Sequence, residues 1–336
     1  MKLRARRLRA RMTQAELAAA TGLSRQLVGA VETGRHAPSV HAAMALATAL
    51  GATVEELFAP EWTERACGVT ETPAEGAPVV ATTIGDRLCV APVADRGAGT
   101  RSWIPADGVY HDGDVALFPD ARPTGAAVAG CDPALGLAAA LLPRRGPRRL
   151  VAIEASSGRA AEALRSGRLH AALVHGPSGA TGRTEGTVRW TMAAWEVGLA
   201  ARPGTHIDLE QIAEGRQRVA QREPSASAQQ ALERALESLG PRPRPVGPLA
   251  SGHLDAARQV VHGAAEAAVT MRAAALAYEL PFLPLERHVV ELVIDERWVG
   301  HPGVAALGEL LGARSFRARL ASLGGYDLSQ AGTRRD

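Results

Sequence analysis

The amino-acid sequence predicts a multidomain protein in which a small all-α domain precedes an α/β domain. Three observations lead to this prediction. Two short, capped helical segments meet at a glycine within residues 13–32. Between about residues 61 and 125, Gly, Pro and Thr become frequent and apolar runs shorten. From residue 126 onward, strand-like and helix-like segments alternate. The chain has 336 residues, 46% of them apolar, which is enough for two or more domains with separate cores.

Residues 13–32 are typical of a helix-turn-helix. Thr13 and Glu16 have the spacing of a capping box, so we expect a helix to begin there. Gly22 permits a left-handed turn, and Ser24 can cap a second helix. The apolar positions of that second helix follow helical spacing: Leu27, Val28 and Val31. Such a motif lays its second helix in the DNA major groove and therefore predicts DNA binding, with an ordinary helical hairpin as the alternative.

The positive charge of the chain is concentrated at its N-terminus. Residues 1–36 carry eight basic and two acidic side chains, whereas the whole chain has a net charge of only +3. A local excess of arginine suits contacts with DNA phosphates, whose strength depends on salt. The charge distribution therefore places the nucleic-acid contact in residues 1–60, the predicted first domain.

Six short motifs connect this domain to a known family. They are residues 14–18 (QAELA), 22–24 (GLS), 32–35 (ETGR), 38–39 (PS), 50–51 (LG) and 56–58 (ELF). With them, residues 3–60 resemble the xenobiotic-response-element (XRE) family, which includes the phage repressors. The resemblance implies that Gln14 holds a phosphate and that Arg25 and Gln26 read bases. Ser24 and Arg35 complete the predicted DNA-binding residues.

Residues 61–125 are predicted to form a small β-rich connector. Residues 78–92 (PVVATTIGDRLCVAP) have the pattern of a hairpin that turns at Gly85 and Asp86. Residues 108–110 and 115–118 can add further strands. The sequence assigns no task to this connector.

The remaining residues predict an α/β domain with parallel strands. The expected strands are residues 126–129, 150–154, 169–174, 188–200, 218–221, 267–270, 282–285 and 289–294. The expected helices are residues 133–142, 158–166, 225–239, 253–262, 272–278, 304–311 and 315–323, and residues 209–214 are left without an assigned type.

This α/β part also contains short sequence motifs of a known family. Each motif alone is a weak indication, but their order along the chain is more specific. They include residues 129–135 (AGCDPAL), 156–158 (SSG), 222–224 (REP), 252–254 (GHL) and 325–327 (GYD). Residues 126–330 thereby resemble the type II periplasmic-binding-protein-like domains that follow helix-turn-helix modules in molybdate- and tungstate-responsive regulators. The resemblance implies two lobes around a cleft. Lobe 1 is expected at about 126–190 and 282–330, and lobe 2 at about 191–280.

The residues themselves point to the same cleft. In open α/β sheets, ligands bind beyond the carboxyl ends of strands, where helix N-termini present free N–H groups. Arg222 is the natural charge partner for an oxyanion in such a cleft. The candidate ligand-binding residues at these turns are Cys131, Asp132, Ser156, Ser157, His175, Arg222, Ser225 and Ser227.

The chain departs from the family pattern at the cleft. Where the family has a glycine-rich segment ending in arginine, residues 225–229 read SASAQ, so Gln229 replaces the arginine. An oxyanion effector such as molybdate or tungstate is therefore one hypothesis. A small organic metabolite and a cleft that no longer binds ligand are the alternatives.

Metal, cofactor and enzyme chemistry are not expected from the sequence. Cys131 could be a soft ligand or a redox sensor, but a buried free cysteine more often fills apolar space. The histidines lack the H-x-H and H-E-x-x-H spacings, so we expect neither a metal site nor a resident cofactor. There is no Ser-His-Asp context, no phosphate loop and no recognisable carboxylate pair, so we expect no enzyme. Trp195, at the crossing between the lobes, is expected to pack in the core.

The three cysteines bear on the compartment. Cys67, Cys89 and Cys131 are odd in number, distant in sequence and without a C-x-x-C spacing, which favours reduced thiols. No apolar run resembles a secretory signal or a membrane span. The sequence therefore predicts a cytoplasmic protein.

Together these features predict a one-component transcription regulator. The first domain would bind operator DNA as a homodimer, and the two-lobed domain would close on a small ligand. The rival interpretation is a DNA-binding scaffold whose degenerate second domain only dimerises or binds a partner. A secreted solute-binding protein is disfavoured by the DNA-binding module.

Overall fold

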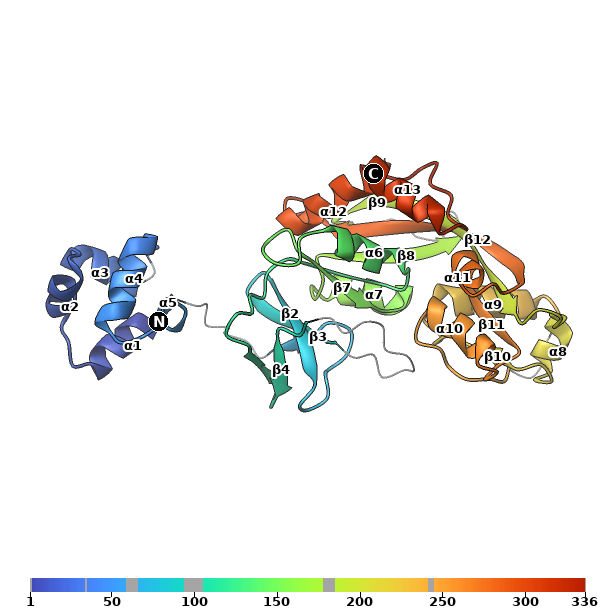
Figure 1. Ribbon diagram of the computed structural model, residues 1–336, viewed down its shortest axis with the longest axis horizontal. Helices are drawn as coiled ribbons and strands as arrows, with labels where there is room; N and C mark the ends of the chain where they lie inside the picture. Colours follow the sequence, from blue (N-terminus) through green and yellow to red (C-terminus); the bar gives the residue numbers. More distant parts are fainter. Residues whose placement is uncertain are drawn as a thin grey trace. The chain divides into compact units, whose positions relative to one another are not determined.

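The computed structural model describes residues 2–33, 35–58, 66–93, 105–177, 185–240 and 245–335 (Figure 1). These residues belong to two compact units, Met1–Thr63 and Glu64–Asp336. Gly34 of the ETGR motif and the predicted domain end at residue 60 lie outside the described residues. The predicted class, an all-α helix-turn-helix region followed by a two-lobed α/β domain, is confirmed.

The first unit contains the helices α1 (Lys2–Arg9), α2 (Gln14–Thr21), α3 (Arg25–Glu32), α4 (Val40–Ala49) and α5 (Val54–Phe58). The capping box of Thr13 and Glu16 starts α2, and Gly22 ends it with a φ of 67°. The Ser24 hydroxyl accepts a hydrogen bond from the N–H of Leu27 and starts α3. The helices close over a core that includes Leu3, Leu17, Val28, Val31 and Leu46.

The second unit begins with a five-stranded sheet in the order β1-β3-β2-β4-β5. Its strands are β1 (Cys67–Gly68), β2 (Pro78–Ile84), β3 (Arg87–Pro92), β4 (Gly108–His111) and β5 (Asp114–Leu117). The predicted hairpin is present, and it turns at Gly85 with a φ of 65°.

This small sheet packs on the α/β domain instead of standing apart as a linker. Val80 and Ile84 join a hydrophobic cluster that also contains Ala127 and Val151 of the α/β domain. Beside that cluster, Arg149 donates two hydrogen bonds of 3.0 Å to the carboxylate of Asp107. Since the pair is largely buried, it fixes the sheet to the strand that follows Arg149.

A second sheet runs through both lobes in the order β10-β11-β9-β12-β8-β6-β7, and β13 (Arg334–Arg335) pairs with β9. Lobe 1 contains β6 (Ala126–Gly130), β7 (Leu150–Glu154) and β8 (Ala171–Pro177), with α6 (Ala134–Leu141), α7 (Ser157–Arg165), η1 (Glu296–Trp298), α12 (Pro302–Gly312) and α13 (Arg314–Ser322). Lobe 2 contains β10 (Val219–Ala220) and β11 (Ala267–Met271), with α8 (Leu209–Ala213), α9 (Ser227–Glu237), α10 (His253–Val261) and α11 (Arg272–Ala277).

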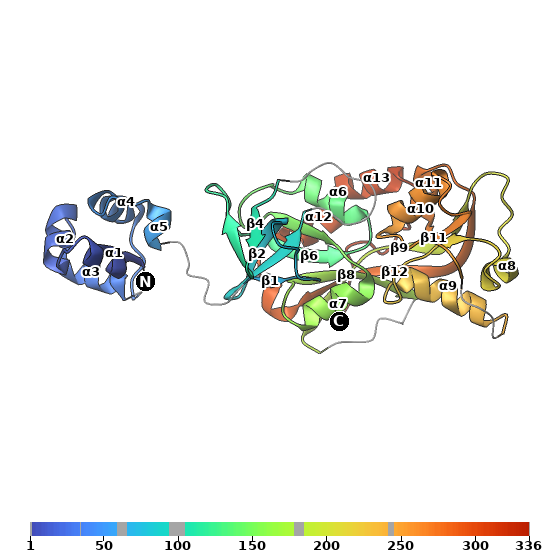
Figure 2. The same ribbon diagram turned by 90° about the horizontal axis from the view of Figure 1, so that it is seen from below.

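Two long strands connect the lobes. β9 (Thr187–Ala201) and β12 (Phe282–Asp295) pair with each other along most of their length, and Figures 1 and 2 show them running from one lobe into the other. Within lobe 1, β6 pairs in parallel with β7 and β8, as the alternating pattern predicts. Any change in the angle between the lobes must therefore bend or twist these two strands.

Two expectations about the strands are wrong. Residues 282–285 and 289–294 were expected to be separate strands, but they form the single strand β12, which has register shifts at Pro284/Glu286 and Val290/Glu291. The charged residues Glu286 and Arg287 interrupt the apolar run there without ending the strand. The sheet is also mixed, because β9 and β12 pair antiparallel to their neighbours. Among the described residues, no helix has the length and apolar character to cross a membrane.

Candidate functional site

The predicted DNA-binding residues gather around the start of α3. Ser24, Arg25 and Gln26 are exposed there, whereas Val28 and Val31 of the same helix are buried. Arg35 is also exposed, and its Nε donates to the Thr33 hydroxyl. Free guanidinium and amide groups on the first turn of this helix are suited to base edges and phosphates.

Gln14 has a structural partner that the sequence did not reveal. Its side-chain amide donates a 2.8 Å hydrogen bond to Glu32, which also receives hydrogen bonds of 2.6 and 3.1 Å from the guanidinium of Arg7. The resulting Arg7–Glu32–Gln14 network connects α1, α2 and α3. Burial raises the pKa of Glu32, but the hydrogen bonds from Arg7 and Gln14 outweigh it and hold that pKa below its ordinary value.

The predicted ligand residues lie where the two lobes face each other. Cys131 and Asp132 follow β6, Ser156 and Ser157 follow β7, and His175 lies in β8. Arg222, Ser225 and Ser227 come from the lobe 2 segment that leads into α9. The structure thus confirms that turns distant in sequence meet at one junction, although their side chains divide into a buried cluster and the wall of a cavity.

The buried cluster is centred on Cys131. Its Sγ lies 3.1 Å from Nε2 of His175 and 3.6 Å from Nε2 of His253, which begins α10 in lobe 2. Nδ1 of His175 lies 2.8 Å from Nδ1 of His288, and Nε2 of His288 lies 2.9 Å from the Glu286 carboxylate. Since Glu286 can only accept, His288 donates through Nε2 and accepts at Nδ1, which leaves Nε2 of His175 without a proton.

Burial sets the protonation of this cluster. It lowers the pKa values of His175 and His253 well below the ordinary value and raises the pKa of the Cys131 thiol to about 12. Glu286 differs, because hydrogen bonds from Arg234 lower its pKa to about 2. Burial also lowers the pKa of His288, so at neutral pH the cluster holds a thiol and three neutral imidazoles beside a carboxylate.

Asp132 has structural partners at both of its oxygens. Oδ2 accepts a 2.9 Å hydrogen bond from Nε1 of Trp195, and Oδ1 accepts from the Tyr326 hydroxyl at 2.8 Å and from the N–H of Ala134 at 2.9 Å. Burial raises the pKa of Asp132, and these donors oppose the rise. Trp195 is buried as predicted, and its ring lies 4.5 Å from that of His175. Asp132 therefore joins β6, β9 and the C-terminal segment.

Arg222 is almost completely buried, with 2% of its surface exposed. Its Nε and Nη2 donate to the carbonyl oxygens of Ala250 and Ser251, at 3.1 and 3.0 Å. Its Nη1 is buried with no partner among the described residues. Gln229, which replaces the family's arginine, accepts a hydrogen bond from the N–H of Arg222 instead of presenting a charge.

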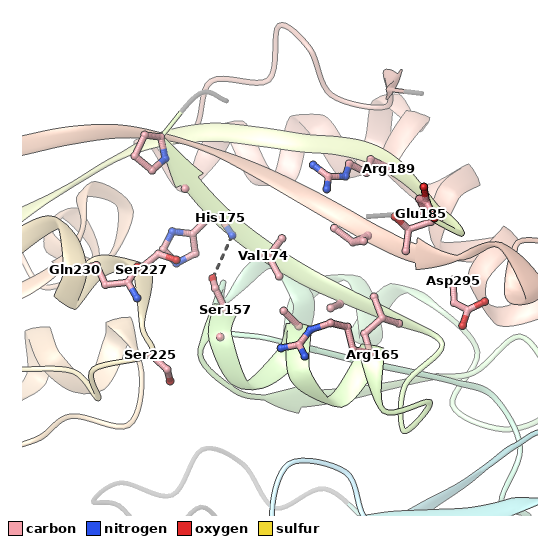
Figure 3. A pocket seen from close by; sticks show the side chains of 18 of the residues that line it. Ser157, Arg165, Val174, His175, Glu185, Arg189, Ser225, Ser227, Gln230 and Asp295 are labelled. Carbon is pink, nitrogen blue, oxygen red and sulfur yellow. Dashed lines mark hydrogen bonds between the residues drawn. The ribbon is translucent and has the colours of Figure 1, made fainter. Parts of the chain in front are cut away.

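The serines lie at the contact between the lobes and at a cavity beside it. The hydroxyls of Ser156 and Ser225 are 2.9 Å apart, and the N–H of Gly158 donates to the carbonyl of Ser225 at 3.1 Å. A Cβ at Gly158 would come within 2.7 Å of Ser225, so this close contact requires glycine. The Ser157 hydroxyl accepts from the N–H of His175 (Figure 3).

The cavity has a volume of about 690 Å³. Ser157 and His175 face it from lobe 1, and Ser225, Ser227 and Gln230 from lobe 2 (Figure 3). Its lining also includes an apolar part with Leu164, Val174 and Val293, and a charged end with Arg165, Glu185, Arg189 and Asp295. Arg222 is not part of the lining, so the predicted charge and the predicted hydroxyls do not meet in this space.

Two family models match the chain. A helix-turn-helix model matches residues 3–57, and a model described as a PBP superfamily domain matches residues 138–312, which is more than half of the chain. The chain belongs to the PBP superfamily. The predicted combination of an XRE-type helix-turn-helix with a PBP-like domain is confirmed, and the DNA-binding module stands N-terminal to the PBP-like domain.

The PBP-like chain is also similar to individual proteins. An uncharacterized protein from the 5′ region of the ferredoxin 2Fe-2S gene of Clostridium pasteurianum is 33% identical over 81 residues, which cover 24% of this chain and 72% of that protein. A putative phosphate transporter substrate-binding protein from Clostridium perfringens, solved with phosphate, is 10% identical with a TM-score of 0.45, covering 60% of this chain and 98% of that one.

Two further solved structures are similar at the same level. The regulatory domain of HypT from Salmonella typhimurium, with bromide bound, is 12% identical with a TM-score of 0.45, covering 61% of this chain and 99% of that one. The periplasmic molybdate-binding protein of Azotobacter vinelandii is 16% identical with a TM-score of 0.43, covering 61% of this chain and all of that one.

Sequence reasoning missed His253 and His288, which complete the buried cluster. Metal-binding motifs that a sequence reveals have short spacings, whereas Cys131, His175 and His253 come from three separate segments. The other two cysteines are also neighbours in space, because β1 pairs in parallel with β3 and places the sulfurs of Cys67 and Cys89 3.1 Å apart. Distance in sequence was no guide to either group.

Proposed function

We propose that this protein is a ligand-responsive, one-component transcription regulator that binds an operator through α3 and senses a small ligand between the lobes of its PBP-like domain. The observation that carries the proposal is the cavity at the lobe junction, in the same chain as a helix-turn-helix whose first α3 turn is polar and exposed. A ligand that binds one arrangement of the lobes better than another shifts the population toward it. The proposal includes a cytoplasmic location and no enzymatic activity.

For DNA binding, we expect Arg25→Ala and Gln26→Ala each to weaken binding to an operator selected from a random-sequence library by about 10- to 100-fold, because each side chain can contact a base edge through paired hydrogen bonds. Fluorescence anisotropy at fixed salt measures this loss. Arg144→Ala removes an equal charge from an exposed turn of the second unit and is the matched control. Equal weakening by all three variants would contradict base reading by α3.

The size of the cavity bears on the ligand class. About 690 Å³ is within the range of sites for small organic molecules, roughly 300–1,000 Å³, and much larger than one oxyanion requires. The apolar side chains of Leu164 and Val174 beside the hydroxyls of Ser157 and Ser227 suit a metabolite with both apolar and polar parts. An oxyanion such as molybdate or tungstate is the second candidate, because Arg222 keeps an unpartnered Nη1.

Thermal unfolding of the full chain with molybdate, tungstate, sulfate and a metabolite panel tests the sensor. A ligand that binds only the folded state adds about 2.7 kcal/mol of stability at a hundredfold excess over its dissociation constant. A metabolite in the cavity should lose its effect in Ser227→Ala, and an oxyanion should lose its effect in Arg222→Met. The exposed Arg202→Ala is a control that should keep either effect.

The assembly follows from the same proposal. Helix-turn-helix proteins commonly bind inverted repeats as two-fold dimers, so we propose a homodimer. Light scattering with and without operator measures its mass. If no ligand changes either stability or operator affinity, the scaffold interpretation, in which the PBP-like domain only dimerises or binds a partner, replaces the sensor.

A further inference from the structure

We propose that Cys131, His175 and His253 form a binding site for a soft monovalent metal ion, copper(I), that bridges the two lobes. Among the described residues, these three offer a thiol sulfur and two imidazole nitrogens that all lie within 4.8 Å of one another. The inference rests on the proposed function for its regulatory role, but metal binding itself can be measured without DNA.

The spacing of the three donor atoms fits one metal ion. Metal–nitrogen bonds of about 2.0 Å and metal–sulfur bonds of about 2.3 Å place the donors of a three- or four-coordinate site about 3.3–3.7 Å apart. Sγ of Cys131 lies 3.1 Å from Nε2 of His175 and 3.6 Å from Nε2 of His253. The two imidazole nitrogens lie within 4.8 Å of each other, so side-chain rotation would complete the spacing that one ion requires.

The neighbouring groups prepare His175 for coordination. Glu286 accepts a hydrogen bond from Nε2 of His288, and Nδ1 of His288 accepts a hydrogen bond from Nδ1 of His175. The lone pair at Nε2 of His175 therefore points at Cys131. Carboxylate-to-histidine relays of this kind fix the orientation of metal-bound imidazoles. On the other side, Nδ1 of His253 is buried with no partner among the described residues. That unpartnered atom shows that hydrogen bonds alone do not satisfy His253.

Burial and charge favour copper(I) over a divalent ion. Cys131, His175 and His253 are each at most 3% exposed, and the Trp195 ring lies 4.5 Å from His175 and 5.4 Å from His253, so there is little room for bound water. The positive charge of Arg222 acts on both Cys131 and His253, while the carboxylates of Asp132 and Glu154 act on Cys131 with the opposite sign. One thiolate with a monovalent ion is neutral, so copper(I) adds no net charge to this low-dielectric site, whereas a divalent ion adds one positive charge. Thiolate and imidazole are also donors that copper prefers.

The site connects the lobes. Cys131 and His175 belong to lobe 1, and His253 begins the first turn of α10 in lobe 2. Binding replaces the S–H bond of Cys131 by a sulfur–metal bond and releases one proton to solvent, with no change in oxidation state. The ion is then bonded to two residues of lobe 1 and to one residue of lobe 2. Such a bridge stabilises the closed arrangement of the lobes, as an effector is expected to do.

Copper(I) titration in competition with a coloured chelator tests the site. The test is made in Cys67→Ala/Cys89→Ala full-length protein, because the two sheet sulfurs are close enough to bind copper themselves. We expect one equivalent of copper(I), at least tenfold weaker binding in Cys131→Ser and in His253→Gln, and no change in His262→Gln, an exposed histidine at the end of the same helix. Zinc(II) is the comparison ion and is expected to bind more weakly.

The outcomes separate the site from its role. The site would be overturned if the Cys67→Ala/Cys89→Ala protein bound no copper(I), or if adding Cys131→Ser or His253→Gln left its affinity unchanged. Tighter binding of zinc(II) than of copper(I) would overturn the choice of ion. X-ray absorption should show one sulfur and two nitrogen ligands at copper. Copper(I) should also change operator affinity in wild-type protein but not in His253→Gln. Binding without that change would retain the site and overturn its role as effector, while the Arg25 variant still reports on DNA recognition.

Discussion

Replacement of Glu32 by glutamine is expected to destabilise the helix-turn-helix unit by about 3 kcal/mol, since removing one partner of a buried ion pair leaves the other charge uncompensated. In wild-type protein the Arg7 guanidinium donates twice to Glu32, and their side chains are 8% and 2% exposed. Small domains often have only about 5 kcal/mol of stability in total. Glu32→Gln should therefore raise the unfolded population of the unit by roughly 100-fold, to about 3% at 25 °C, and operator binding should be lost at a lower temperature than in wild-type protein.

Hydrogen exchange along the full chain can locate this loss. Amides of α1 to α3 should exchange faster in Glu32→Gln, while those of the PBP-like domain stay unchanged. Arg6→Gln is the matched control on the same helix, because the contacts of Arg6 are exposed: an ion pair with Glu56 at 3.9 Å and a hydrogen bond of 3.2 Å to the carbonyl of Gly51. A double variant, Arg7→Leu with Glu32→Leu, removes both charges and should recover much of the loss. Equal exchange in wild-type and Glu32→Gln protein would refute the structural role of the pair.

The acid stability of the same unit should change in a defined direction. The folded-state pKa of Glu32 is below its unfolded value, which is about 4.3. Its contribution is thus complete above the unfolded pKa and is lost as the pH falls through the folded pKa. Wild-type protein should lose stability on acidification through this group, whereas the stability of Glu32→Gln should depend less on pH in that window.

The sequence predicted the elements that local rules determine. Caps at Thr13 and Ser24, the turn at Gly22 and the hairpin at Gly85 depend on residues within a few positions of each other, and all are present. The continuous strand β12 was missed because antiparallel pairing with β9 maintains it through its charged middle, Glu286 and Arg287, whereas β8 pairs with it only from His288 onward. Strand pairing between distant segments overrides local pattern in such cases.

The sequence predicted where the site lies, but not which partners its side chains have. Strand ends identified Cys131, Ser157 and His175, because the carboxyl ends of strands meet at one edge of a sheet. Which side chains point inward, and which find partners, depends on packing between lobes. Arg222 was expected to face a ligand, yet two of its nitrogens bond to backbone carbonyls. His253 was not predicted as a metal ligand, because no short spacing connects it to the other donors.

Asp132→Ala is expected to destabilise the PBP-like domain by about 3 kcal/mol or more, because it leaves three donors without their acceptor: the Trp195 indole, the Tyr326 hydroxyl and the Ala134 N–H. A buried donor that loses its partner costs about 1–3 kcal/mol. Chemical unfolding followed by tryptophan fluorescence measures the effect. Asp132→Asn keeps an acceptor oxygen and should lose clearly less.

The same pair of variants decides between two roles for Asp132. The sequence predicted a ligand-binding residue, whereas its hydrogen bonds in the structure indicate that it positions the turn carrying Cys131 against β9 and Tyr326. Under the structural role, Asp132→Asn retains the stabilising effect of whichever ligand or metal ion raises the unfolding midpoint of wild-type protein. If Asp132→Asn is as stable as wild type but has lost that response, Asp132 contacts the ligand directly. The carboxylate would then have to leave Trp195 or Tyr326 on binding, which would shift the tryptophan emission as the ligand is added.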